Sequence, residues 1–186
     1  MKKITSLIII LAFVIIGYLL FQKVNKNNNP ETSVFTYNST TTNSNFSFNH
    51  PKTWKEPQIQ KLGTVEKIIF NNGLVVQSGR TKNQQTGEIM SVKEAAQNDL
   101  ETNPGDPLIT STTIAGVDAQ QVDLTIPKGH IGKLQDGSPI PPKPVEITDI
   151  FFSEDNSTST PVIFLRFSQN AKEYLDLIKE SFKFNN

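Results

Sequence analysis

The segment Pro161-Val162-Ile163-Phe164-Leu165-Arg166-Phe167 carries the clearest fold signal in the sequence. In a β-strand, successive side chains point to opposite faces of the sheet. Apolar residues occupy both even-numbered and odd-numbered positions of this segment, and the same holds for Val145 to Ser153. Because both faces of such strands have to be covered, we expect the two segments in the centre of a sheet that lies between helical layers.

Further strands are predicted on the N-terminal side of this pair. Two pairs of apolar runs are joined by glycine-containing turns and predict β-hairpins: 65–70 with 74–77, and 108–115 with 119–126. Alternate residues of the run 119–126 are polar, which predicts one solvated side or a place near a sheet edge. Aromatic runs at 34–37 and 46–49 predict two more strands, the second followed by a turn.

Two helices are available to cover the sheet. Ser91-Val92-Lys93-Glu94 is a capping box, in which the serine hydroxyl and the glutamate satisfy free backbone amides at a helix start. A second amphipathic helix is predicted from about Asn170 to Phe182. Strands and helices in this order predict an α+β fold, an α/β/α sandwich with a central antiparallel sheet of about six or seven strands and two main helices.

The N-terminal segment predicts where the chain sits. The eighteen residues from Ile4 to Phe21 carry no charge and follow Lys2 and Lys3. As a helix they reach about 27 Å, which is close to the thickness of a bilayer core. The sequence therefore predicts a cytoplasmic N-terminus at 1–3, a single-pass transmembrane signal anchor at 4–21, a flexible linker at 22–31 and an extracytoplasmic domain at 32–186.

A cleaved secretory signal is the alternative to a retained anchor. Such signals have a shorter apolar core and a small-x-small cleavage site, whereas this segment ends in Leu19-Leu20-Phe21-Gln22-Lys23. The sequence contains no cysteine, which excludes a lipoprotein signal, disulfides, thiolate zinc sites and thiol nucleophiles. Lysine plus arginine and aspartate plus glutamate number 18 each, so nothing indicates a nucleic-acid partner.

The domain resembles a known family, most clearly in its first two predicted strands. Thr36-Tyr37-Asn38 followed by Phe46-Ser47-Phe48-Asn49-His50-Pro51-Lys52-Thr53-Trp54 is similar to the opening of PsbP-like domains, Phe-x-Phe-x-Tyr-Pro-x-x-Trp after an aromatic strand. Helix 91–101, hairpin 114–119 and the closing residues 181–184 also fit, so the resemblance covers about residues 32–184. It implies that four residues are structural signature positions: Phe46, Phe48, Pro51 and Trp54.

The resemblance implies an antiparallel sheet with helices on both faces, and it implies little about function. Plant and cyanobacterial members are extrinsic luminal proteins of photosystem II that influence calcium and chloride retention, whereas many bacterial relatives are envelope proteins. His50 stands where the family usually has tyrosine, and an anchor replaces a thylakoid transit signal. We therefore expect a bacterial, membrane-anchored member, and we transfer the fold without any ligand residue.

Candidate chemistry is sparse. Lys128, His130 and Lys133 lie in a long loop with two glycines, and such a loop can approach an anion through backbone amides and ammonium groups. His50 is expected to be a packed, structural histidine. No G-x-S-x-G motif occurs, and scattered acids such as Asp123 and Asp149 are expected to be solvated.

The sequence therefore predicts a non-enzymatic protein-interaction module of the cell envelope, without a cofactor, a metal or a catalytic residue. Its expected partners are the membrane, through residues 4–21, and another envelope protein. Two alternatives stay open at this level. One is a module that binds a small ligand, an anion or a metal through the loop 128–133, and the other, less favoured, is an envelope hydrolase.

Overall fold

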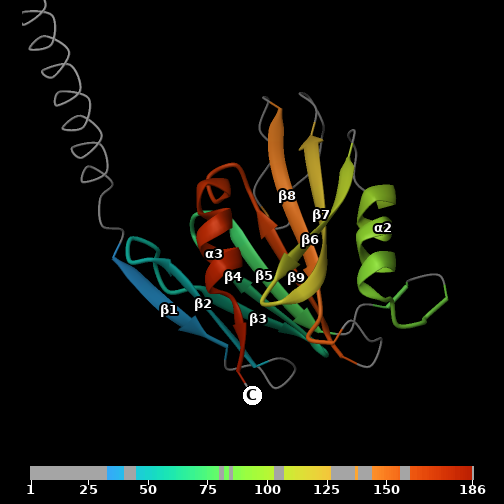
Figure 1. The fold of residues 1–186 in the computed structure, drawn as a ribbon, viewed down its shortest axis with the longest axis horizontal. Helices are drawn as coiled ribbons and strands as arrows, with labels where there is room; N and C mark the ends of the chain where they lie inside the picture. The colour runs from blue at the N-terminus through green and yellow to red at the C-terminus, as the bar shows by residue number, and fades with distance from the viewer. Residues whose placement is uncertain are drawn as a thin grey trace, which may run out of the picture. The chain divides into compact units, whose positions relative to one another are not determined.

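The computed structural model describes residues 33–39, 45–79, 82–83, 86–102, 107–126, 137, 144–155 and 160–185. These ranges contain ten strands in two antiparallel sheets, two α-helices and one short 3-10 helix (Figure 1). The chain divides into the units Met1–Ser33 and Val34–Asn186, and all of these elements belong to the second unit. The predicted anchor at 4–21 and linker at 22–31 lie outside the described residues.

The larger sheet has seven strands and is antiparallel throughout. In spatial order its strands are β3 (Gln58–Leu62), β4 (Val65–Ile69), β5 (Leu74–Gly79), β9 (Val162–Phe167), β8 (Val145–Phe152), β7 (Val117–Ile126) and β6 (Leu108–Ile114). Strand β9 is therefore fourth of seven, between β5 and β8, which confirms the central position predicted from its two apolar faces. Both predicted hairpins, β4–β5 and β6–β7, are confirmed.

The predicted central antiparallel sheet of about six or seven strands is present, but part of the β-structure lies outside it. A second sheet of three antiparallel strands has the order β1 (Val34–Asn38), β2 (Phe46–Pro51) and β10 (Lys183–Phe184). Strands β3 and β10 were not predicted from the sequence. All five residues of β3 are exposed, so it lacks a buried face that would give an alternating pattern, and β10 has only two residues.

The helices begin near the predicted positions. Helix α2 (Val92–Thr102) follows the capping box, in which the Ser91 amide donates to Glu94 Oε2 at 2.7 Å and the Glu94 amide donates to Ser91 Oγ at 3.3 Å. The second predicted helix is in fact a 3-10 turn, η1 (Lys172–Tyr174), followed by helix α3 (Leu175–Ser181). Ala171, Ile178 and Phe182 form its buried face, as predicted.

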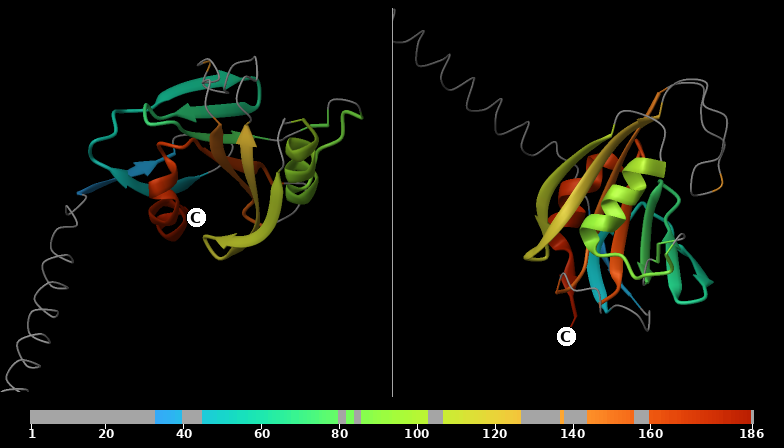
Figure 2. Two further views of the ribbon diagram at one scale, coloured as in Figure 1. Left: turned by 90° about the horizontal axis from the view of Figure 1, so that it is seen from above. Right: turned by 90° about the vertical axis from the view of Figure 1, so that its right-hand side faces the viewer.

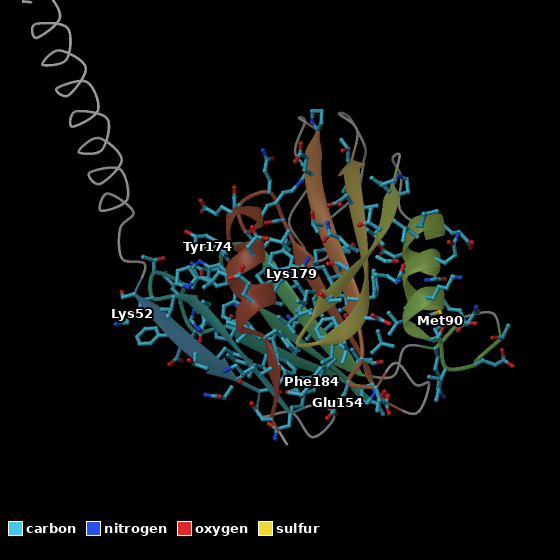
Figure 3. The ribbon with its side chains drawn as sticks, viewed as in Figure 1. Lys52, Met90, Glu154, Tyr174, Lys179 and Phe184 are labelled. Carbon is cyan, nitrogen blue, oxygen red and sulfur yellow. The ribbon has the colours of Figure 1, made fainter. Side chains whose placement is uncertain are left out.

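Each face of the seven-stranded sheet has its own apolar cluster. Helix α2, with Met90 at its start, packs on the face that includes Val122, Phe151 and Phe164 (Figure 3). The opposite face is covered by α3 together with the three-stranded sheet, through Phe48 and Phe182 among others (Figure 2). One covering layer is therefore a sheet and a helix combined, where the sequence predicted a helix alone.

Candidate binding groove

The residues singled out from the sequence divide into two groups. Lys128, His130 and Lys133 lie outside the described residues. The signature positions are structural: Phe46 and Phe48 are fully buried on β2, Pro51 closes that strand, and Trp54 is buried after the turn in which its amide donates to the Pro51 carbonyl at 3.1 Å.

A groove of about 550 Å³ lies between residues of β1 and β3, which are edge strands of the two sheets. Its apolar and aromatic lining comes from strands β1, β2 and β3 and from the connection between β2 and β3. These residues are Phe35, Tyr37, His50, Trp54, Pro57 and Ile59. This volume is within the range of pockets that bind ligands or peptide side chains. The groove was not predicted from the sequence, because it depends on two edges from separate sheets coming together.

The inner wall of the groove is a packed set of aromatic rings. The His50 and Trp54 rings stack with centroids 5.7 Å apart, and Trp54 meets Tyr174 edge to face at 5.2 Å. Tyr37 packs against Phe48, with 5.4 Å between centroids. Such contacts hold the rings in fixed positions, so the inner wall is preformed.

The outer rim exposes apolar side chains to solvent. Phe35 is 53% exposed and Ile59 is 46% exposed, although both belong to regular strands. The Lys52 ammonium lies 5.3 Å from the centroid of the Phe35 ring, and Glu56 adds one carboxylate to the lining. Covering a large apolar side chain is worth roughly 1.5–3 kcal/mol, so the rim favours an apolar occupant.

Several buried side-chain polar atoms make no hydrogen bond, and of the three below only the one on Tyr37 belongs to a residue that lines the groove. Among the described residues, the Tyr37 hydroxyl, Glu66 Oε1 and Ser78 Oγ are buried and make none, although Lys61 Nζ lies 3.8 Å from Glu66 Oε1. Burial, and next the charge of Glu66, raise the pKa of Tyr37, so its hydroxyl keeps its proton and is a donor.

His50 serves as a neutral ring of the inner wall. Burial lowers its pKa below the usual value, against the opposing effect of a hydrogen bond with the Pro51 carbonyl. The distance from His50 Nδ1 to that carbonyl oxygen is 3.0 Å. The histidine is therefore packed and structural, as predicted.

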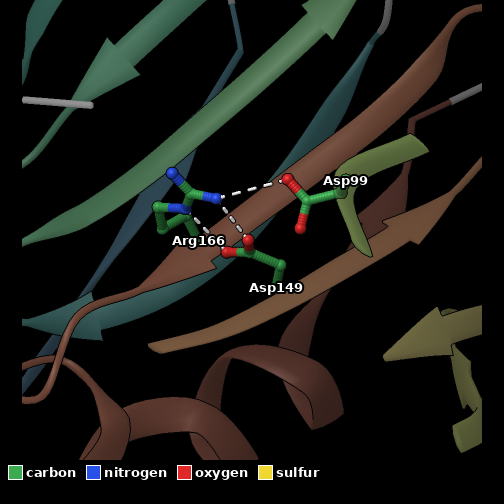
Figure 4. A network of polar contacts seen from close by, with 3 residues as sticks. All are labelled: Asp99, Asp149 and Arg166. Atoms are coloured by element: carbon green, nitrogen blue, oxygen red, sulfur yellow. Dashed lines mark hydrogen bonds and ion pairs between the residues drawn. The ribbon is translucent and has the colours of Figure 1, made fainter. Parts of the chain in front are cut away.

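A buried ion-pair network lies on the face of the seven-stranded sheet that α2 covers (Figure 4). Arg166 of β9 bonds Asp149 of β8 through two nitrogens, with 2.8 Å from Nε to Oδ1, and its Nη2 lies 3.5 Å from Asp99 of α2. The prediction that Asp149 is solvated is wrong, because the side chain is fully buried between β8 and α2. The network joins α2 to the central strands, which is a structural role.

Two other site types receive no support in the described part of the chain. A hollow of about 240 Å³ beside α2 is lined by Glu88, Glu94 and Glu101 among others. No group of three or more histidine, aspartate or glutamate residues there is arranged to hold a metal ion. Within the same residues, no helix has the length and apolar character needed to cross a membrane.

Comparison of the chain with protein-family models, with curated proteins and with solved structures gave no match.

Proposed function

We propose that this domain is a protein-binding module that accepts an extended apolar segment of a partner protein in the groove between β1 and β3. The observation that carries the proposal is an aromatic groove bordered by two edge strands. An edge strand offers unpaired backbone groups to an incoming strand, and pockets beside it select alternate side chains.

The charge and shape of the groove support this class of partner. Strand β1 has five residues and no charge. It pairs with β2 along one edge, and no strand of the described residues pairs with its other edge. Phe35 of β1 and Ile59 of β3 supply apolar contacts from the two edge strands. A small apolar molecule is the second candidate, because the volume of the groove also suits one.

The single tryptophan makes the proposal testable. Trp54 lines the groove, so its fluorescence reports occupancy. We expect selection from a display library of unstructured peptides to enrich sequences with alternating apolar residues, and the selected peptides to shift the Trp54 emission. Phe35→Ser combined with Ile59→Ser should weaken their binding at least tenfold, because it removes both exposed apolar walls.

Leu62→Ser is the matched control, because Leu62 is 66% exposed on β3 but is not among the residues that line the groove. If the groove variant and the control bind the selected peptides equally, the proposal is wrong. If a small apolar dye shifts Trp54 emission while no peptide is enriched, the second candidate replaces it.

We also propose that the domain is held at the outer face of a bacterial cell membrane by residues 4–21, as a PsbP-like member of the envelope. The uncharged segment after Lys2 and Lys3 supports the anchor, and the residues around Phe46 to Trp54 support the family resemblance. In that position the groove would face other envelope proteins.

A further inference from the structure

Strand β6 forms an edge of the seven-stranded sheet that lacks the usual protection. In the part of the chain that the structure describes, its one strand neighbour is β7, and its seven residues Leu-Ile-Thr-Ser-Thr-Thr-Ile include no charge and no proline. Natural proteins usually place lysine, proline or a bulge on such an edge to prevent pairing with another chain. Among the described residues, none of the backbone hydrogen bonds outside helices and strands involves β6.

The sequence of β6 is largely symmetric about Ser111, with Ile109 and Thr113 as the one pair that differs in polarity. An antiparallel copy centred on Ser111 places Thr110 opposite Thr112 and Ile109 opposite Thr113, with apolar residues facing each other at the two ends. Threonine pairs and apolar pairs stabilise antiparallel neighbours by about 0.2–1 kcal/mol each, and no like charges meet. A two-fold interface needs this kind of self-complementarity.

We infer that β6 pairs with β6 of a second copy of this chain, antiparallel and centred on Ser111, so that the two large sheets become one continuous sheet.

The surroundings of β6 leave room for this partner. Leu108, Thr110, Ser111 and Thr113 are exposed, whereas Ile114 is buried against the α3 side. Ile109 packs against the apolar cluster beneath α2. One face of β6 is therefore turned toward α2, and the face that carries Ile114 is turned toward α3. In an antiparallel pair, directly opposite residues point to the same side of the sheet. A two-fold pairing of β6 would therefore place the α2 sides of both copies on one face of the joined sheet and the α3 sides on the other.

Charged side chains near β6 come from β7, where Asp118 and Asp123 pair with Thr113 and Leu108, and from α3. Lys179 donates to Thr112 Oγ1 at 2.8 Å, and Asp176 and Glu180 line the same hollow beside β6. The lysine therefore lies between two acids of its own helix, and the exposed part of the strand stays neutral.

The absence of cysteine from the sequence allows a register test on the full chain in detergent micelles. Ser111→Cys places the two thiols directly opposite each other, at about 4.5–5.5 Å between Cα atoms, which is suitable for a disulfide. We expect mild oxidation to give covalent dimers at least tenfold faster than with Gln60→Cys, an exposed position on β3.

The register itself is tested with two more variants. Thr110→Cys alone should crosslink slowly, because the diagonal neighbours are roughly 7–8 Å apart. A mixture of Thr110→Cys and Thr112→Cys should crosslink faster than either alone. Equal rates for Ser111→Cys and Gln60→Cys, with unchanged thermal unfolding, would show that β6 is not an interface. If the mixture of Thr110→Cys and Thr112→Cys crosslinks no faster than either variant alone, the pairing centred on Ser111 is wrong.

Discussion

Asp149 and Arg166 face each other across β8 and β9, in strands otherwise built mainly from apolar residues. The sequence did contain a signal for this pair, because a charge in a strand with two covered faces has to be buried. What the sequence could not supply was the register that makes the two residues partners, nor the place of Asp99 on α2 above them.

The buried carboxyl of Asp149 predicts a pH-dependent stability. Burial, opposed by Arg166, raises its pKa from 3.8 to about 7. In the native state Asp149 is therefore a neutral carboxyl bonded to Arg166 below about pH 7 and forms the ion pair above it, whereas the unfolded chain releases this proton near pH 4. The free energy of unfolding should fall by a few kcal/mol between these values and then level off, because each pKa unit corresponds to about 1.4 kcal/mol.

Urea unfolding followed by Trp54 fluorescence from pH 4 to 8 measures this dependence. Asp149→Asn cannot titrate and should remove most of the slope, whereas Asp118→Asn, an exposed substitution on β7, should leave it intact. A slope that persists in Asp149→Asn would assign the titration to another group.

At the level of elements, two hairpin turns differ in what their glycines tolerate. Gly73, between β4 and β5, has φ +93°, and a Cβ there would lie 1.9 Å from Ser168 Oγ and 2.9 Å from Ser168 Cβ. Gly116, between β6 and β7, has φ +80° and open space around it. Left-handed backbone costs an L-residue about 1–2 kcal/mol at either site, and the contact with Ser168 adds to this at Gly73.

We therefore expect Gly73→Ala to lower the thermal unfolding temperature clearly more than Gly116→Ala. Differential scanning calorimetry of the two variants checks this. If the unfolding temperatures of the two variants decrease equally, the Ser168 side chain moves away from the new methyl group without loss of stability.

The elements predicted well from the sequence are those with a strong local signal. The capping box at Ser91 and the glycine turns are local, and the two apolar faces of β9 follow from its own residues. Strand β3 has no such signal, since all its residues are exposed, and the split into two sheets depends on contacts far apart in sequence. The groove could not be predicted for the same reason.

At the scale of the whole molecule, the boundary after Ser33 predicts that the domain is independent of the segment before it. A chain lacking residues 1–31 should unfold at the same temperature as the full chain, because no element of the second unit is removed. It should also lose membrane association, which sedimentation of cell membranes measures against the full chain. Sedimentation of the shortened chain with membranes would contradict the predicted anchor.

The three-stranded sheet joins the two ends of the domain. Strand β2 lies between β1, the first strand, and β10, the last, and Ser47 donates a hydrogen bond to Asn185. The rings of Phe46 and Phe48 stack on Phe182, at 5.1 and 5.9 Å between centroids. During synthesis the cover that Phe182 gives to Phe46 and Phe48 can form only after residues 182–185 have left the ribosome, so this part of the core depends on a segment that is made late.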